Sequence, residues 1–175
     1  MALNLEQKQA IVAEVADVAS KAFSAIAAEY RGLTVGQLTK LRREARSNGV
    51  YVRVVKNTLA RRAVEGTSFA CMQEGLTGPL ILAFSMEDPG AAARVIKDFM
   101  KGNDRFVVKL VSVSGKLLAP SELETLAKMP TYEQAVAMLM SVMKAPVQKL
   151  AATLNEVPGK LVRTIAAIRD AKEAA

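Results

Sequence analysis

The chain has 175 residues, 51% of them hydrophobic, and a formal net charge of +7 at pH 7. It is long enough for one globular domain with an appendage and apolar enough for a packed core, which excludes a chain that is disordered throughout. Its apolar stretches are far shorter than the roughly 20 residues that span a bilayer, and Glu6 and Lys8 stand where a signal peptide would be apolar. We therefore expect a cytoplasmic protein in which the single Cys71 forms no internal disulfide and fills part of the core.

Apolar periodicity and capping residues predict alternating helices and strands up to about residue 130. The predicted helices cover 4–21, 34–48, 57–66, 88–101 and a short stretch from 121, and the predicted strands cover 23–30, 50–55, 79–84 and 106–113. Asn57 is the predicted N-cap of the third helix, and Asp88 with Pro89 begins the fourth. This order indicates an α/β (α+β) fold in which helices flank a mixed sheet, followed by a helical C-terminal part.

Positive charge is concentrated in one block of the sequence. Between Arg31 and Glu65 nine basic residues stand against two acidic ones, whereas the rest of the chain has fifteen of each. Such a block is typical of a protein that binds a polyanion, because lysine and arginine displace counterions from phosphates. A solvated basic surface is the alternative, but the block spans several predicted elements, which favours polyanion binding. Lys56 and Asn57 stand at a strand-to-helix junction, where backbone N–H groups could hold a phosphate or form an ordinary cap.

The C-terminal part, from residue 131, predicts one long helix with an internal repeat. Three approximate elevens begin at Leu139, Leu150 and Leu161. Because eleven residues make almost three helical turns, corresponding positions share one stripe of the helix. Pro146 and Pro158 should bend this helix, which is therefore expected to consist of jointed segments.

The apolar stripe of this helix is expected to bind other chains. The alternatives are that the helix folds back on its own domain or forms a coiled coil, and a period of eleven rather than seven disfavours the coiled coil. A repeat suggests identical partners, one for each segment. The residues assigned to this surface are Leu139, Met143, Leu150, Leu154, Val157, Leu161, Ile165 and Ile168.

The sequence contains little that indicates catalysis. It has no histidine and no clustered cysteines, so we expect no nucleophile–histidine pair, no metal site and no cofactor. Residues Ser114, Gly115 and Lys116 have the order found in a phosphate loop but lack its other positions. We expect a protein that is not an enzyme, although lysine or carboxylate catalysis is left open.

Several motifs in this order resemble the family of bacterial large-subunit ribosomal protein ten. They lie at residues 30–36, 54–66, 89–94, 129–135 and 160–175 and together span nearly the whole chain. The resemblance implies a structural ribosomal protein at the base of the stalk, whose N-terminal domain binds large-subunit ribosomal RNA near ribosomal protein eleven. It also implies a C-terminal helix that carries dimers of the acidic stalk protein seven/twelve, which recruit translational GTPases, and repression of translation of its own messenger RNA.

The resemblance also assigns roles to residues of the basic block. It implies RNA contacts by Arg31, Gly32, Lys56, Asn57, Thr58, Arg61 and Arg62. Local charge adds Arg43 and Arg53, although individual arginines could instead brace the fold through carboxylates. Since the block has few aromatic residues, we expect recognition of phosphates and RNA shape rather than base stacking.

These features define the hypotheses for the two parts of the chain. Residues 1–130 are expected to bind large-subunit RNA and residues 131–175 to dock stalk-protein dimers, three if every repeat is used and two if the prolines disable the middle one. The alternatives are an RNA-binding regulator that works without a ribosome, or a small nucleotide-binding enzyme that uses the basic block to hold phosphates.

Overall fold

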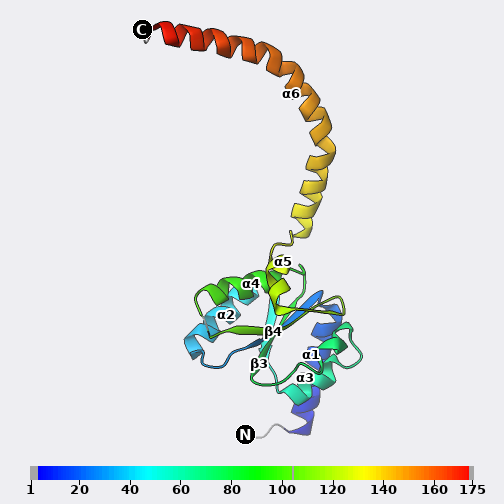
Figure 1. The fold of residues 1–175 in the computed structure, drawn as a ribbon. Helices are drawn as coiled ribbons and strands as arrows, with labels where there is room; N and C mark the ends of the chain where they lie inside the picture. The colour runs from blue at the N-terminus through cyan, green and yellow to red at the C-terminus, as the bar shows by residue number, and fades with distance from the viewer. Residues whose placement is uncertain (1–3, 104, 174–175) are drawn as a thin grey trace. The chain divides into compact units, whose positions relative to one another are not determined.

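The structure is a computed structural model that describes residues 4–103 and 105–173, apart from the side chain of residue 157. The chain divides into two units between Thr131 and Tyr132. The first unit is an α/β domain, and the second is helix α6, Tyr132–Glu173 (Figure 1). The predicted fold class, a sheet flanked by helices and followed by a long C-terminal helix, is confirmed.

The sheet has five strands in the order β2-β3-β1-β4-β5. Their bounds are β1 Ser24–Glu29, β2 Val50–Val54, β3 Leu80–Ser85, β4 Val107–Val113 and β5 Lys116–Leu118. Every neighbouring pair is antiparallel, so the prediction of a mixed sheet was wrong in this respect. The physical reason is that β3 lies between β1 and β2, which run in the same direction but never pair with each other.

Helices cover both faces of this sheet (Figure 1). One apolar cluster joins it to α2, α4 and α5, which span Val35–Ser47, Ala91–Lys101 and Leu123–Ala127. The other joins it to α1, α3 and the 3₁₀ helix η1, which span Leu5–Lys21, Asn57–Val64 and Ser68–Met72. Side chains alternate between the two faces along each strand, so one strand contributes to both clusters. Ile26 and Ala28 belong to the first cluster, and Ala25 and Ala27 belong to the second.

Two helix starts differ from the sequence prediction. The N-cap of α3 is Lys56 rather than Asn57, because the Asn57 amide donates a hydrogen bond to the Gly78 carbonyl. Helix α4 begins at Ala91 rather than at Asp88 and Pro89, because the Asp88 carboxylate accepts a hydrogen bond from Arg94 instead of capping the helix. Hydrogen bonds of the expected capping side chains therefore accompany both differences.

Two short elements were missed by the sequence analysis. Helix η1 directs Phe69 and Met72 into the core and leaves Cys71 exposed, with its Sγ 3.3 Å from Ser112 Oγ. The prediction that Cys71 fills the core was therefore wrong. Strand β5 follows a turn at Ser114 and Gly115, both with positive φ, which gives the Ser-Gly-Lys sequence a structural role. A 3₁₀ turn, η2 at Pro120–Glu122, then leads into α5.

Helix α6 continues through both of its prolines. The predicted segments are therefore not separated by breaks, and the helix bends along its course instead (Figure 1). None of its described side chains is buried within this unit. Among the helices in the described ranges, none is both long and apolar enough to cross a membrane.

Candidate nucleic-acid interface and partner-docking helix

Strands β1 and β2 bring two distant parts of the basic block to one edge of the sheet. Both strands pair antiparallel with β3, so their carboxyl ends lie on either side of its first residues. Glu29 pairs with Leu80, and Val54 pairs with Ile81. The turn that follows β1 and the junction that follows β2 therefore lie at the same edge. We call this edge, made of residues 30–32, 56–58 and 78–79, the basic edge.

Hydrogen bonds to the segment before β3 hold the basic edge together. The Tyr30 backbone N–H donates to the Pro79 carbonyl at 3.3 Å, and Asn57 Nδ2 donates to the Gly78 carbonyl at 2.8 Å. The same segments line a hollow of about 390 Å³, and its lining includes Tyr30, Lys56 and Thr58. Two motifs that lie about 25 residues apart in the sequence thus line one hollow.

The predicted RNA contacts on α3 divide into braced and exposed side chains. Arg61 donates a hydrogen bond to the Leu76 carbonyl at 2.9 Å, so it and Asn57 brace the segment that enters β3. Lys56 and Arg62 are exposed and form no ion pair with another part of the described chain. Thr58 is also exposed. The exposed cations could reach a phosphate without first losing a protein partner.

Arg53 has its own partners on the α1 side of the sheet. It forms an ion pair with Glu14 and donates a hydrogen bond to Tyr51 Oη at 2.9 Å. Tyr51 Oη donates to Glu14 at 2.6 Å. The hydrogen bond from Tyr51 lowers the pKa of Glu14 most, and the hydrogen bond from Arg53 lowers it next. The hydrogen bond with Glu14 in turn raises the pKa of Arg53. Burial and the bond with Glu14 raise the pKa of Tyr51. Arg53 thus ties β2 to α1, as the bracing alternative expects.

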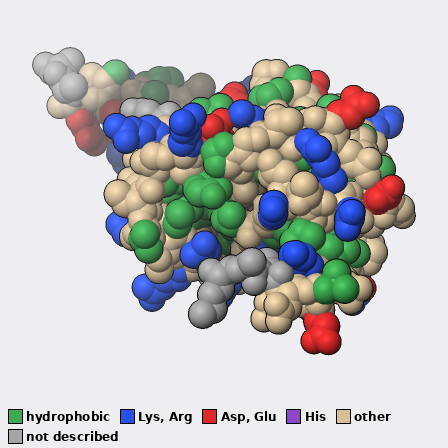
Figure 2. All heavy atoms as spheres, turned by 90° about the horizontal axis from the view of Figure 1, so that it is seen from below, with side chains coloured by type: hydrophobic (Ala, Val, Ile, Leu, Met, Phe, Trp, Pro, Cys, Tyr) green, Lys and Arg blue, Asp and Glu red, His purple; other side chains and the backbone are tan. Residues whose placement is uncertain are grey.

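The structure therefore brings most, but not all, of the predicted RNA contacts together. Arg31 and Gly32 lie in the exposed turn after β1, next to the junction at Lys56. Arg43 is exposed on α2, which covers the opposite face of the sheet from α3. Figure 2 views the molecule from below, the side of Figure 1 where α3 and the start of α1 lie. Lysine and arginine side chains are spread over that face, and acidic side chains lie mostly towards its outline.

Two cations outside the basic block also lie at the basic edge, and the sequence analysis missed them. A Cβ at position 32 would lie 3.1 Å from Arg105 Cδ, and a Cβ at position 78 would lie 3.6 Å from Lys109 Nζ. Lys109 Nζ also lies 2.9 Å from Glu29 Oε2. Lys109 lies on β4, which pairs with β1, and Arg105 lies just before β4 begins. Only the strand pairing reveals this neighbourhood, because charge density along the sequence does not.

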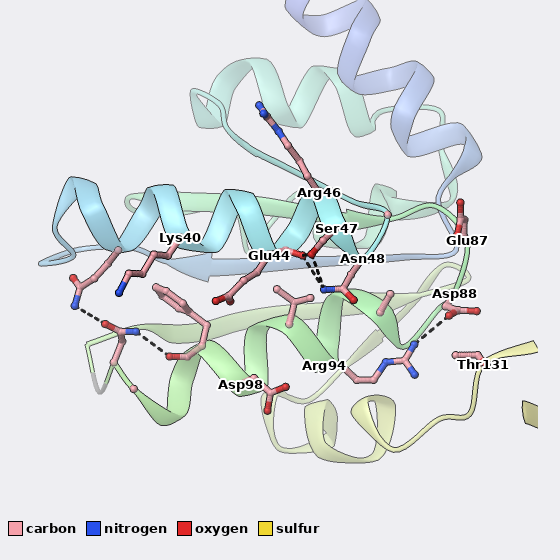
Figure 3. A pocket seen from close by; sticks show the side chains of 17 residues that line it. Lys40, Glu44, Arg46, Ser47, Asn48, Glu87, Asp88, Arg94, Asp98 and Thr131 are labelled. Atoms are coloured by element: carbon pink, nitrogen blue, oxygen red, sulfur yellow. Dashed lines mark hydrogen bonds and ion pairs between the residues drawn. The ribbon is translucent and has the colours of Figure 1, made fainter.

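A larger hollow of about 1240 Å³ lies between α2 and α4 (Figure 3). Arg94 points toward Asp88, with 3.2 Å between Nη2 and Oδ2. The charged residues around the hollow are Lys40, Arg46 and Arg94 against Glu44, Glu87, Asp88 and Asp98. Four carboxylates against three cations do not favour a nucleotide's phosphates, which weighs against the enzyme alternative. Within the described ranges, no cluster of three or more histidine, cysteine or acidic residues is placed to hold a metal ion.

The apolar stripe on α6 is exposed along the whole helix. At about 100° per residue in an ideal helix, its residues fall within an arc of roughly 80°. The exposed fractions range from 58% to 72% for Leu139, Met143, Leu150, Leu154, Leu161, Ile165 and Ile168. Val157, also predicted to contribute, lies outside the described side chains.

Comparison with known proteins identifies the family. A model described as ribosomal protein L10 matches residues 3–101, and a model of the uL10 C-terminal region matches residues 129–157. The large ribosomal subunit protein uL10 of Thioalkalivibrio sulfidiphilus is 70% identical over 174 residues, which is 99% of each chain. The chain belongs to the ribosomal protein L10 family.

Further relatives support the L10 assignment over the full chain. The uL10 proteins of Alkalilimnicola ehrlichii and Halorhodospira halophila are 66% and 62% identical over 175 residues, which is all of each chain. The resemblance found in the sequence is thereby confirmed. L10 proteins belong to the large ribosomal subunit and are not enzymes, as predicted. The first family match covers every predicted RNA contact, and the second covers the first part of α6.

Proposed function

We propose that this L10-family chain forms the base of the large-subunit stalk. Its α/β unit binds large-subunit ribosomal RNA through the basic edge, close to ribosomal protein eleven. Its helix α6 anchors dimers of the acidic stalk protein seven/twelve, which recruit translational GTPases. The observation that carries the RNA-binding part is the convergence of the Arg31 turn and the Lys56 junction on either side of β3.

Electrostatics supports the choice of RNA as the ligand of the basic edge. Arg31, Lys56 and Arg62 are exposed on elements that meet at or next to this edge. Tyr30 is the only aromatic residue among those that line the described hollow, so there is little surface for stacking bases. The edge therefore suits the phosphates and shape of a folded RNA better than unstacked bases.

A charge-matched pair of double variants tests the RNA proposal. We expect Arg31→Gln with Lys56→Gln to weaken binding of the full chain to deproteinised large-subunit RNA by about tenfold or more at low salt. The slope of log K against log salt should fall by about 1.5, since each lost phosphate contact contributes roughly 0.7–0.9. Lys116→Gln with Lys128→Gln removes the same charge from exposed positions elsewhere. Equal losses in both double variants would contradict the proposal.

The exposed stripe supports the docking function of α6. Burying one leucine or isoleucine side chain stabilises a complex by roughly 1.5–3 kcal/mol, so each eleven-residue segment offers enough apolar surface for a stable partner. The helix has 42 residues and is therefore about 63 Å long at 1.5 Å per residue. Three segments of about 16 Å fit within this length. We propose one stalk dimer per segment and hence three dimers.

The number of docked dimers is directly measurable. Native mass spectrometry of the full chain reconstituted with purified stalk protein should show three dimers per chain. Two dimers would defeat the three-site proposal and would point to the middle segment, which contains Pro158, as the inactive one.

A ribosome-independent regulator predicts different behaviour. A stalk-base protein should cosediment with large subunits after a high-salt wash, whereas a free regulator should remain in the supernatant. Repression of the chain's own messenger RNA would use the same basic edge. The double variant at Arg31 and Lys56 should then lose binding to the ribosomal RNA and to the messenger RNA together. Loss of binding to only one of them would contradict a shared edge.

A further inference from the structure

We propose that two further RNA contacts belong to the basic edge: Arg105, which lies just before β4, and Lys109, which lies near the start of β4. This inference rests on the proposed RNA-binding function. It extends the interface beyond the basic block and across the sheet from β2, through β3 and β1, to β4.

Arg105 lies beside the turn that carries Arg31. The turn is closed by Gly32, whose φ of 83° is a left-handed conformation that glycine adopts readily. The Arg105 stem lies against Gly32, where a Cβ would come within 3.1 Å of Arg105 Cδ. Arg105 is exposed and forms no ion pair within the described part of the chain. A phosphate that reached Arg31 would therefore meet a second guanidinium.

A β-bulge brings Lys109 to the same edge. Ala28 pairs with Val108 and Ala27 pairs with Leu110, so Lys109 is the extra residue on β4. Bulges re-aim a side chain that regular alternation would place elsewhere. Here Lys109 Nζ lies 2.9 Å from Glu29 and 3.6 Å from the position of a Cβ at Gly78. Lys109 thus lies beside the segment that Asn57 braces from the other side.

Glu29 is the carboxylate at this cluster of cations. Its ion pair with Lys109 leaves 39% of the lysine side chain and 21% of the glutamate side chain exposed. The glutamate side of the pair is mostly buried, but Lys109 keeps enough of its side chain exposed for its ammonium group to meet a phosphate as well. Glu29 acts as an internal counterion that a phosphate would supplement or replace. Its removal should strengthen RNA binding.

Four single variants of the full chain test the inference against deproteinised large-subunit RNA over a range of salt concentrations. We expect Arg105→Gln and Lys109→Gln each to weaken binding at least about threefold and to lower the salt slope by about 0.7–0.9. Glu29→Gln should strengthen binding. Lys116→Gln, an exposed lysine at the far end of the same hairpin, should leave the affinity and the slope unchanged.

The outcomes separate this inference from the function on which it rests. If the double variant at Arg31 and Lys56 loses binding while Arg105→Gln and Lys109→Gln behave like Lys116→Gln, the inference is overturned and the proposed function stands. If the unmodified chain does not bind the RNA, both are overturned. If the ion pair only braces the fold, Glu29→Gln and Lys109→Gln should lower the melting temperature by the same amount and weaken RNA binding by the same amount, with no change in the salt slope. That outcome would also overturn the inference. A fifth variant, Lys109→Arg, keeps the charge, and RNA binding as tight as that of the unmodified chain would support a phosphate contact.

Discussion

The two units of this chain treat the same kind of side chain in opposite ways. In the α/β unit Ile26 is fully buried, whereas Ile165 on α6 is 59% exposed. Both belong to regular apolar patterns, but the sheet residues are covered by helices of the same unit and those of α6 are not. The difference teaches that periodicity predicts an apolar face and does not reveal what covers it. In the first unit the cover is the chain itself, and in the second we propose that it is another protein.

The largest expected effect comes from a core substitution. Phe84 is 1% exposed on β3, and its ring centroid lies 6.2 Å from that of Phe69. We expect Phe84→Ala to lower the free energy of unfolding of the α/β unit by about 3–5 kcal/mol, because it removes buried contacts and leaves a cavity. Ile165→Ala should change it by less than about 0.5 kcal/mol. Urea unfolding followed by hydrogen exchange of sheet amides measures both, and similar losses would erase the contrast between the units.

The next largest effect should fall on partner docking. Leu154 is 71% exposed in the middle segment of the stripe. We expect Leu154→Asp to weaken the middle site by about 3 kcal/mol, or roughly 100-fold, because an apolar contact is lost and a charge is placed in its position. Native mass spectrometry should then show two stalk dimers instead of three. Ala152→Asp adds the same charge on the opposite side of the helix, and an equal loss there would exclude the stripe as the docking surface.

A smaller effect should distinguish bracing residues from contact residues at the basic edge. Asn57→Ala removes the hydrogen bond to the Gly78 carbonyl and should cost about 1 kcal/mol of unfolding free energy. Thr58→Ala, at the exposed neighbouring position, should leave stability nearly unchanged. Thermal unfolding of the two variants gives the comparison, and equal stability would mean that the Asn57 contact braces nothing.

The smallest expected effect is the pH dependence of the link between α1 and β2. Because its pKa is lowered in the folded chain, Glu14 stabilises the fold above the ordinary glutamate pKa of about 4.3, and this contribution disappears as pH falls through the lowered value. Glu14→Gln should therefore be less stable than the unmodified chain at pH 7, and the difference in melting temperature should shrink towards pH 3. A difference that grows on acidification would contradict this role.

Local sequence patterns predicted most of the helices and strands of the fold. The capping box of Thr34 and Gln37 starts α2 as expected, and Arg53 points away from Val50 and Val52 because strand side chains alternate. Tertiary contacts decided the features that were missed. Asn57 binds the Gly78 carbonyl and does not cap α3, and β3 separates β1 from β2.

The candidate interface was only partly predictable for the same reason. Motif resemblance gave Arg31 and Lys56, but their common edge depends on strand order, a long-range property. Alternation did not predict the bulge at Lys109, which places Val108 and Leu110 in opposite apolar clusters although regular alternation would put them on one face. Cys71 shows the converse, an apolar residue type that a short 3₁₀ helix leaves exposed.

The most direct test of the account is to delete residues 139–175 and measure both binding activities. Every residue of the two apolar clusters precedes Lys128, so the deletion removes no core contact. We expect the shortened chain to bind deproteinised large-subunit RNA within about twofold of the full chain, since the phosphate contacts remain, and to bind no stalk dimers. Loss of both activities, or retention of stalk-dimer binding, would contradict the division into an RNA-binding unit and a docking helix.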